Sequence, residues 1–487
     1  MSRSGDPAVS QGGEPPVSRG DEPAVSRGDE PPVTVIEGAY VATVDRADTE
    51  YPVGYAVITG NRITAVGPGS APPGARLGAQ LIDGSGCLLT PGLVNGHHHL
   101  YQWLTRGLAQ DATLFGWLST LYPIWARIDA DAVYAAAAAN LGWLALSGCS
   151  ASSDHHYVFP APVGGGSVGG GDLLEAEVAA ACRIGVRFHP CRGSMDLGRS
   201  AGGLPPDAVV EDRDTILLAT EAAVDRWHDP SFDAMTRIAV APCSPFSVTS
   251  ELMRESADLA RAKGVRLHTH LAETADEASF CLTTYGKTPA EYLEDLGWLG
   301  DDVWLAHGIH LSDAAIARFA ATGTAVAHCP TSNGRLGAGS ARIRDLLDAG
   351  VPVGLGVDGS ASNESGRLVD ELRAALLVAR LRGGPQALTA RECLRLATIG
   401  GARCLGRDTE IGSLEVGKVA DLALWRVDGL GHAGCADPVW SFAFGCAPLE
   451  LLIVNGRRVV ERQCLLTADS AVLTDALVAA TRGLAQP

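Results

Sequence analysis

The chain has 487 residues, a length that suits one large domain with a smaller unit attached. Its formal net charge of −18 argues against a nucleic-acid partner held by a basic surface. No apolar run approaches the ~18 residues needed to cross a bilayer, so we expect no membrane association. The 12 cysteines show no disulfide-scaffold spacing and no secretory leader precedes them, which predicts a reduced, cytoplasmic protein.

The N-terminal residues 1–33 contain four copies of an eight-residue unit, SRSGDPAV, SQGGEPPV, SRGDEPAV and SRGDEPPV. Proline, glycine and charged residues dominate, and the period matches neither a helix nor a strand. Such a unit cannot bury a core, so we expect these residues to be disordered and to have no catalytic role.

Short strands separated by turns predict a small β-sandwich built from both chain ends. In residues 34–90, Tyr55–Ile58 and Ile63–Gly67 flank the turn Thr59–Arg62, which is typical of a β-hairpin. Residues 406–487 contain similar strands, at Ala420–Trp425 and Leu451–Val460, followed by a tail. We expect the two β-rich ends to pair with each other.

Residues 91–405 alternate short apolar strands with helical stretches, which predicts a (β/α)₈ barrel of the TIM type. A doubly wound open sheet is disfavoured because no GxGxxG follows the first strand, interpreted here as Leu88–Val94. Further predicted strands are Val265–Leu267, Val303–Ala306, Ala325–Ala327 and Val353–Val357. The predicted helices are Thr249–Ala262, Asp313–Ala321 and Ala341–Ala349.

Five short polar motifs follow predicted strands of the barrel. Because the carboxyl ends of barrel strands meet at one face, we expect the motifs to share one pocket. The motifs are Asn95–His99 (NGHHH), His268–Glu273 (HTHLAE), Leu305–His307 (LAH), His328–Pro330 (HCP) and Gly356–Gly359 (GVDG). Together they indicate a hydrolase in which a metal ion activates water.

The first motif places His97 and His99 two residues apart, so that an extended chain points both rings toward one metal. His98 should point away. In the second motif, His270 is a candidate ligand and Glu273 a candidate proton carrier on the same loop. His268 shares the face of His270 and is expected to support the ligands rather than bind the metal.

The remaining site residues are His307 and Asp358. His307 is either a ligand or a group that polarises the substrate, and Asp358 can bind a metal and accept a proton from water. Three histidines and one carboxylate leave an open position, as catalytic zinc requires. A binuclear site commonly needs a carboxylated lysine, and residues 238–245 hold no Lys or Glu, so we expect one divalent metal. Zn²⁺ is favoured, with Fe and Mn left open.

The motifs PGLVNGHHHL, HTHLAET, LAHGIHL, AHCPTSN and GLGVDGSASNE resemble the mononuclear deaminase branch of the amidohydrolase superfamily. The resemblance extends from about residue 34 to the end of the chain. It implies His97, His99, His270 and Asp358 as metal ligands. It also implies Glu273 as the proton shuttle, His307 as the group that orients hydroxide, and metal-activated hydroxide attacking an amidine-type ring carbon.

Other segments are similar to 8-oxoguanine deaminases: HHLYQ, LYPIW, SDHHY, RGSM and GGLPPD. This similarity implies deamination of 8-oxoguanine to urate and ammonia, with Gln102, Tyr157 and Arg192 contacting a small heterocyclic substrate. The alternatives are hydrolysis of an s-triazine amine or halide, and deamination of guanine, isocytosine or a pterin. An inactive barrel scaffold is disfavoured because no ligand is missing. The aromatic segment Trp117–Trp125 is a candidate interface for a homo-oligomer.

Overall fold

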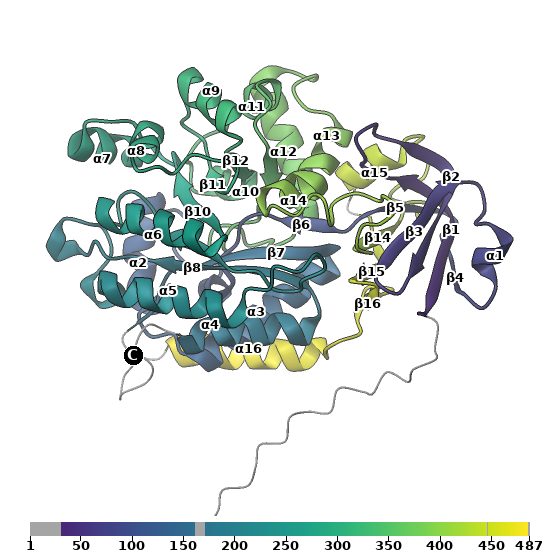
Figure 1. The fold of residues 1–487 in the computed structure, drawn as a ribbon, viewed down its shortest axis with the longest axis horizontal. Helices are drawn as coiled ribbons and strands as arrows, with labels where there is room; N and C mark the ends of the chain where they lie inside the picture. Colours follow the sequence, from purple (N-terminus) through teal and green to yellow (C-terminus); the bar gives the residue numbers. More distant parts are fainter. Residues whose placement is uncertain (1–30, 161–170, 446, 486–487) are drawn as a thin grey trace, which may run out of the picture.

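The computed structural model describes residues 31–160, 171–445 and 447–485. Eight parallel strands pair in sequence order and curl into a barrel, which confirms the predicted architecture (Figure 1). The Gly96 N–H donates to the Leu355 carbonyl and links the last strand to the first. The strands are β6 (Leu93–Asn95), β7 (Cys149–His156), β8 (Arg187–Ser194), β9 (Ala239–Pro242), β10 (Arg266–Leu271), β11 (Val303–His307), β12 (Ala325–His328) and β13 (Val353–Leu355).

Helices surround the barrel (Figure 1). The predicted helices at residues 249–262, 313–321 and 341–349 are confirmed as α6, α9 and α11, with ends that differ by no more than two residues. The longer helices are α2 (Leu114–Trp125), α3 (Ala130–Leu146), α4 (Gly171–Ile184), α5 (Arg213–Trp227), α6 (Ser250–Lys263), α7 (Ala275–Tyr285), α9 (Asp313–Thr322) and α12 (Leu368–Gly383). Shorter ones are α8 (Pro289–Asp295), α10 (Pro330–Arg335), α11 (Ile343–Asp348), α13 (Ala390–Arg395) and α14 (Gly401–Cys404).

Helix α6 illustrates why these segments become helices. The Thr249 hydroxyl accepts a hydrogen bond from the Leu252 N–H and so caps the first turn. Leu252, Ser256 and Ala260 recur every four residues and are buried against the barrel. The helix ends at Gly264, whose φ of 68° is a left-handed conformation that favours glycine.

The two chain ends pair into one separate sheet of nine strands. The predicted hairpin is present as β2 and β3, joined by the two-residue loop Gly60–Asn61. Apolar side chains from both ends of the chain share one cluster, so the sheet curls around a small core of its own. Its strands are β1 (Val33–Ala42), β2 (Glu50–Thr59), β3 (Arg62–Pro68), β4 (Gln80–Asp83), β5 (Cys87–Pro91), β14 (Leu422–Arg426), β15 (Leu449–Val454), β16 (Arg457–Glu461) and β17 (Cys464–Leu465).

The prediction of a single strand at Leu88–Val94 is wrong. The structure divides this segment into β5, which belongs to the nine-stranded sheet, and β6, which opens the barrel. Gly92 lies between the strands and passes so close to Ser150 that a side chain there would collide with the serine hydroxyl. A glycine at this position therefore lets the chain cross from one sheet to the other.

Trp117 and Trp125 are buried on α2, so the segment Trp117–Trp125 belongs to the core and offers no aromatic interface.

Beyond the last strand, the chain forms α16 (Ser470–Ala485), a helix that packs on α3 (Figure 1). The octapeptide repeats lie outside the described residues except for residues 31–33. Among the helices that the structure describes, none is long and apolar enough to cross a bilayer.

Candidate metal centre and substrate cavity

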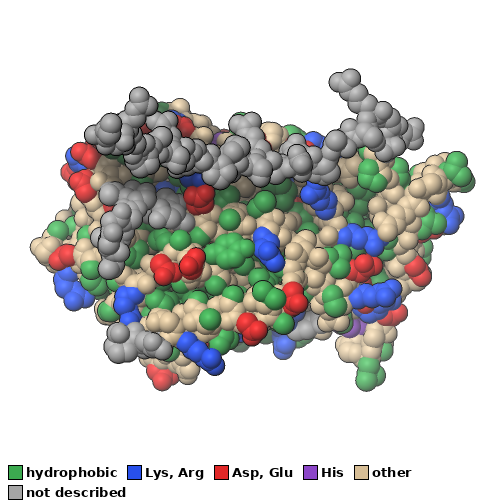
Figure 2. Space-filling model, turned by 90° about the horizontal axis from the view of Figure 1, so that it is seen from below, with side chains coloured by type: hydrophobic (Ala, Val, Ile, Leu, Met, Phe, Trp, Pro, Cys, Tyr) green, Lys and Arg blue, Asp and Glu red, His purple; other side chains and the backbone are tan. Residues whose placement is uncertain are grey.

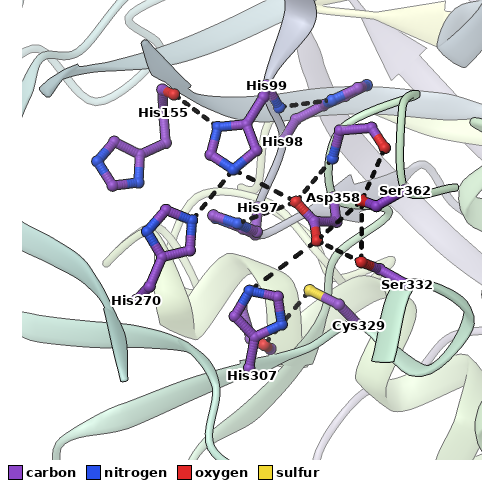
Figure 3. Close-up of polar contacts among 12 residues, drawn as sticks. His97, His98, His99, His155, His270, His307, Cys329, Ser332, Asp358 and Ser362 are labelled. Carbon is purple, nitrogen blue, oxygen red and sulfur yellow. Dashed lines mark hydrogen bonds and ion pairs between the residues drawn. The ribbon is translucent and has the colours of Figure 1, made fainter. Parts of the chain in front are cut away.

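Four donor atoms meet at the carboxyl end of the barrel. His97 and His99 follow β6, His270 lies on β10 and Asp358 follows β13. The His99 Nε2 atom lies 3.1 Å from His270 Nε2, and the Asp358 Oδ1 atom lies 3.4 Å from His97 Nε2 and 3.3 Å from His99 Nε2 (Figure 3). A tetrahedral ion with bonds of about 2.1 Å holds its donors about 3.4 Å apart, so the spacing fits such an ion.

Hydrogen bonds behind the rings turn the Nε2 lone pairs toward this point. His99 Nδ1 lies 2.7 Å from the His155 carbonyl oxygen, and His270 Nδ1 lies 2.7 Å from that of Cys243. A carbonyl only accepts, so each Nδ1 must carry the proton, and each Nε2 is left free to bind a metal.

His97 is oriented through a second histidine. Its Nδ1 lies 2.8 Å from His268 Nε2, while His268 Nδ1 lies 2.9 Å from the Trp304 carbonyl oxygen. The carbonyl fixes the proton on His268 Nδ1, so His268 Nε2 accepts and His97 Nδ1 donates. His97 Nε2 is buried and has no hydrogen-bond partner among the described residues. Burial also lowers the pKa of His97 and of His270 well below the usual value, which keeps both rings neutral.

The backbone around the donors is unusual. Ala272, His307 and Asp358 adopt positive φ values of 51°, 72° and 64°, a region that side chains other than glycine rarely occupy. Glycines flank Asp358 because the chain is crowded there. A Cβ at Gly356 would lie 2.7 Å from His97 Cβ, and one at Gly359 would collide with Gln102. The Gly-Val-Asp-Gly motif therefore reflects close packing against both the metal centre and the cavity.

Glu273 and His307 face each other beside the donor group. His307 Nε2 lies 3.7 Å from Glu273 Oε2 and 3.9 Å from Asp358 Oδ2. The Asn333 amide oxygen lies 2.9 Å from His307 Nδ1 and so holds a proton there. Burial, with Asp358 close by, raises the pKa of Glu273 well above its usual value. Glu273 can therefore hold a proton at neutral pH and donate it.

A cavity lies over these residues. Gln102 and Tyr157, which the similarity implies as substrate contacts, are among the residues that line this cavity. The Gln102 amide nitrogen donates to the Tyr157 hydroxyl at 3.3 Å, and its Oε1 has no partner among the described residues. The other lining residues are His99, Leu114, Trp117, Leu118, Tyr122, Cys243, Ser244, Phe246, His270, Glu273, His307, Leu336, Asp358 and Ser362.

Arg192 is placed differently from the prediction. It is not among the residues that line the cavity. Its guanidinium donates to the Glu211 carboxylate at 2.8 Å and lies 3.7 Å from the centre of the Phe159 ring. These contacts hold the charge away from the cavity, so Arg192 has no place in the substrate site proposed below.

Sequence reasoning missed several supporting residues. His155 supplies the carbonyl that orients His99, and its ring stacks on His270 with centroids 4.8 Å apart. Ser332 donates to Asp358 Oδ2 at 2.6 Å (Figure 3). The HCP motif thus contributes through the Ser332 and Asn333 that follow it. His328 itself is buried, and its ring nitrogens have no partner among the described residues.

His98 and Asp154 hold the turn that carries Gln102. His98 points away from the donor group, as expected, and its Nε2 lies 3.0 Å from Asn140 Oδ1. Asp154 accepts the Leu100 N–H at 2.6 Å. The SDHHY segment at the end of a strand was the sequence signal that could have identified Asp154 and His155. It could not show their roles, because the partners of these side chains lie on other elements.

Comparison with known proteins identifies the group to which the chain belongs. The model of the "Amidohydrolase family" matches residues 88–459. The chain is 45% identical over 388 residues to the 8-oxoguanine deaminase of Pseudomonas aeruginosa, covering 79% of this chain and 84% of that protein. It is 37% identical over 396 residues to the hydroxydechloroatrazine ethylaminohydrolase of Pseudomonas sp. (strain ADP), covering 79% and 80%.

A solved structure agrees with these matches. The zinc complex of atrazine chlorohydrolase TrzN from Arthrobacter aurescens TC1 superposes with a TM-score of 0.86 at 36% identity, covering 92% of this chain and 100% of that chain. The described residues also contain a buried His/Asp group able to hold a metal ion. The chain therefore belongs to the amidohydrolase family and is a hydrolytic deaminase that acts on carbon–nitrogen bonds.

Proposed function

We propose that this hydrolase deaminates an oxidised purine, 8-oxoguanine, to urate and ammonia. We further propose that His97, His99, His270 and Asp358 hold one divalent metal, Zn²⁺. The observation that carries the proposal is the meeting of these four donors directly beneath the cavity that Gln102 lines. The 45% identity to an 8-oxoguanine deaminase supports the choice of substrate.

The cavity suits a neutral, flat ring. Aliphatic and aromatic side chains form much of its wall, and none of the described residues that line it is Lys or Arg, so a phosphate or carboxylate on the substrate would find no cationic partner among them. The unpaired Gln102 Oε1 is an acceptor for a ring N–H, and the Tyr157 hydroxyl adjoins it. A ring that offers no N–H at that edge would leave the buried Gln102 oxygen without a hydrogen bond, so the cavity would bind that ring more weakly.

The chain's own residues then carry out the proton transfers. When bound, the metal lowers the pKa of a water molecule toward ~7 and so supplies the nucleophile. Asp358 accepts a proton from the water, and its Oδ2 is held by Ser332. Glu273 gives its proton to the ring nitrogen next to the attacked carbon. His307 stabilises the charge that develops on the added oxygen. The carbon–nitrogen bond to the exocyclic amine then breaks, and the amine leaves as ammonia with the proton that Asp358 took from the water. The remaining proton of the added hydroxyl returns to Glu273 as the ring carbonyl forms.

The test is ammonia release by zinc-loaded protein from 8-oxoguanine, guanine, isocytosine, a pterin and an aminotriazine. We expect the highest kcat/KM with 8-oxoguanine. Ammonia release from one of the other rings, and none from 8-oxoguanine, would support the deaminase chemistry and refute 8-oxoguanine as the substrate. A metal-loaded protein that releases no ammonia from any of the five would reject the proposal as a whole.

The second candidate is removal of an amine or halide from an s-triazine. The 37% identity to hydroxydechloroatrazine ethylaminohydrolase favours it, as does the lack of Lys and Arg among the lining residues that the structure describes. The two candidates differ at Gln102, because a dialkylated triazine offers fewer ring N–H groups to its Oε1 than an oxidised purine does. The aminotriazine in the panel therefore separates them.

A further inference from the structure

Helix α7 begins with a glutamate that has unusual hydrogen-bond partners. Glu277 is the third residue of α7, and its side chain is fully buried. Its two carboxylate oxygens accept the N–H groups of Ala272 and Glu273, each at 2.8 Å. A glutamate at this helix position ordinarily accepts the N–H of the N-cap residue, which here is Thr274. Glu277 therefore reaches past the N-cap to the two residues before it.

Two other helices of the protein show the ordinary arrangement. Glu291 in α8 and Glu392 in α13 occupy the same helix position, and each accepts the N–H of its own N-cap threonine. Glu291 does so while it is exposed to water. Capping a helix therefore does not require a buried glutamate, so the burial of Glu277 is explained by its contacts with the residues before the helix.

Burial of the Glu277 carboxylate is unfavourable by itself. Asp and Glu side chains are scattered over the face of the molecule in Figure 2, where water solvates their charge. Glu277 has no such solvation, and no Lys or Arg among the described residues forms an ion pair with it. Burial raises its pKa to about 7, although the N–H groups of Glu273 and Ala272 act in the opposite direction. These two N–H groups are therefore the contacts that offset the loss of water.

The two N–H groups belong to a strained turn that follows β10. Ala272 has a φ of 51°, which residues other than glycine rarely adopt. Its carbonyl accepts the N–H groups of Ile309 and His310, both at 2.9 Å, and so ties the turn to the segment that follows β11. Glu277 holds the N–H side of the same turn. The direction in which the Glu273 side chain leaves the turn therefore depends on both sets of contacts.

We propose that Glu277 is a positioning residue for the proposed proton donor Glu273. By accepting the N–H groups of Ala272 and Glu273, its carboxylate keeps the turn in the conformation that points the Glu273 side chain toward His307. In this conformation Glu273 Oε2 lies 3.7 Å from His307 Nε2. Glu277 is not among the residues that line the cavity, so it acts through Glu273. This role rests on the proposed function, in which Glu273 gives its proton to the substrate ring.

Glu277→Gln tests this role. The amide keeps the size of the side chain, but one oxygen becomes an NH₂ donor, so one of the two N–H groups loses its acceptor. The Thr274 hydroxyl still accepts the backbone N–H of residue 277 and caps α7. With the best substrate of the five rings, kcat should fall about 10- to 100-fold, because small displacements of a reacting group have effects of that size. KM and the zinc Kd should change less than about 3-fold, since Gln102 and the metal donors are untouched.

A double-mutant cycle separates positioning from general damage to the site. If Glu277 acts only through Glu273, adding Glu277→Gln to Glu273→Gln should lower kcat by no more than about a further 2-fold. Damage to the site as a whole would instead multiply the two losses. Glu291→Gln is the matched control, because it makes the same change at the same helix position of α8, where the glutamate is exposed, and it should leave kcat unchanged.

Circular dichroism melting checks that every variant is folded. If Glu277→Gln does not fold, Glu277→Asp takes its place, since the shorter side chain keeps the charge but withdraws both oxygens from the N–H groups. Wild-type kcat in the Glu277 variant, or losses that multiply in the cycle, would overturn the positioning role. Full activity of Glu273→Gln would refute the proton donor itself and, with it, the role of Glu277.

Discussion

Replacing His268 with phenylalanine tests whether the proposed ligand His97 depends on the residue behind it. The His268 ring is fully buried and stacks on Trp304 with centroids 4.4 Å apart. Phenylalanine keeps the ring and its stacking but lacks the Nε2 atom that lies 2.8 Å from His97 Nδ1. The variant therefore removes hydrogen bonds while changing the packing little.

The expected effect is on metal affinity. Without the acceptor, the His97 proton is no longer confined to Nδ1, and a ring protonated on Nε2 cannot bind the metal. Losing such a partner weakens metal binding about 10- to 100-fold, which corresponds to about 1.4–2.7 kcal/mol. The kcat of the fully loaded variant should change much less, because His268 does not line the cavity.

Competition with a chromogenic chelator measures the Kd for zinc. His328→Phe is the matched control. Like His268, His328 is buried and its pKa is lowered to about 3 by burial, but its ring nitrogens have no partner among the described residues. An unchanged Kd for His268→Phe, or an equal loss in the control, would refute the reasoning.

Three further predictions concern proton transfer, substrate binding and stability. Glu273→Gln removes the proposed proton donor, so kcat for ammonia release should fall about 100-fold or more while metal content stays the same. Gln102→Leu removes the unpaired acceptor in the cavity, so kcat/KM for 8-oxoguanine should fall about 10-fold or more, with the zinc Kd unchanged. Burial raises the pKa of Glu177 to about 8, so the unfolding free energy in denaturant titrations should decrease by about 2 kcal/mol between pH 6.5 and pH 8.

The sign of the last prediction follows from proton binding. Folded Glu177 keeps a proton up to about pH 8 that the unfolded chain releases near 4.5, so its stabilising effect is full below 4.5 and lost as the pH rises to 8. Burial lowers the pKa of its partner His156 to about 4 from the usual 6.5. This shift makes the fold more stable as the pH rises, but only up to about pH 6.5, so it does not offset the loss from Glu177 above that pH. A Glu177→Gln variant should therefore show a flatter profile above pH 6.5, and parallel profiles would contradict the assignment.

Control measurements decide whether the effects of Glu273→Gln and Gln102→Leu are specific. Glu251→Gln, an exposed change on α6, should leave kcat unaffected. If Glu273→Gln were as active as this control, Glu273 would not be the proton donor. If Gln102→Leu lowered activity equally toward every ring in the panel, Gln102 would shape the cavity without selecting the substrate.

Much of the fold was predictable because the signals are local. Apolar strands alternating with helices predict the barrel, and the predicted α6, α9 and α11 are present with small shifts at their ends. The division of Leu88–Val94 into β5 and β6 was not predictable, since both pieces are equally apolar. What separates them is the contact of Gly92 with Ser150, which lies 58 positions farther along the chain.

The sequence by itself determined which donors stand at the barrel's carboxyl end, because strand geometry gives His97 and His99 one direction and His98 the other. Only the tertiary structure decided what each side chain does there. The protons on the rings depend on partners from other strands, such as His268 and Cys243. Arg192 follows the same local pattern as a site residue, yet Glu211 and Phe159 hold it away from the cavity. Local periodicity sets the direction of a side chain relative to its own strand, whereas hydrogen bonding and burial are set by residues distant in the sequence.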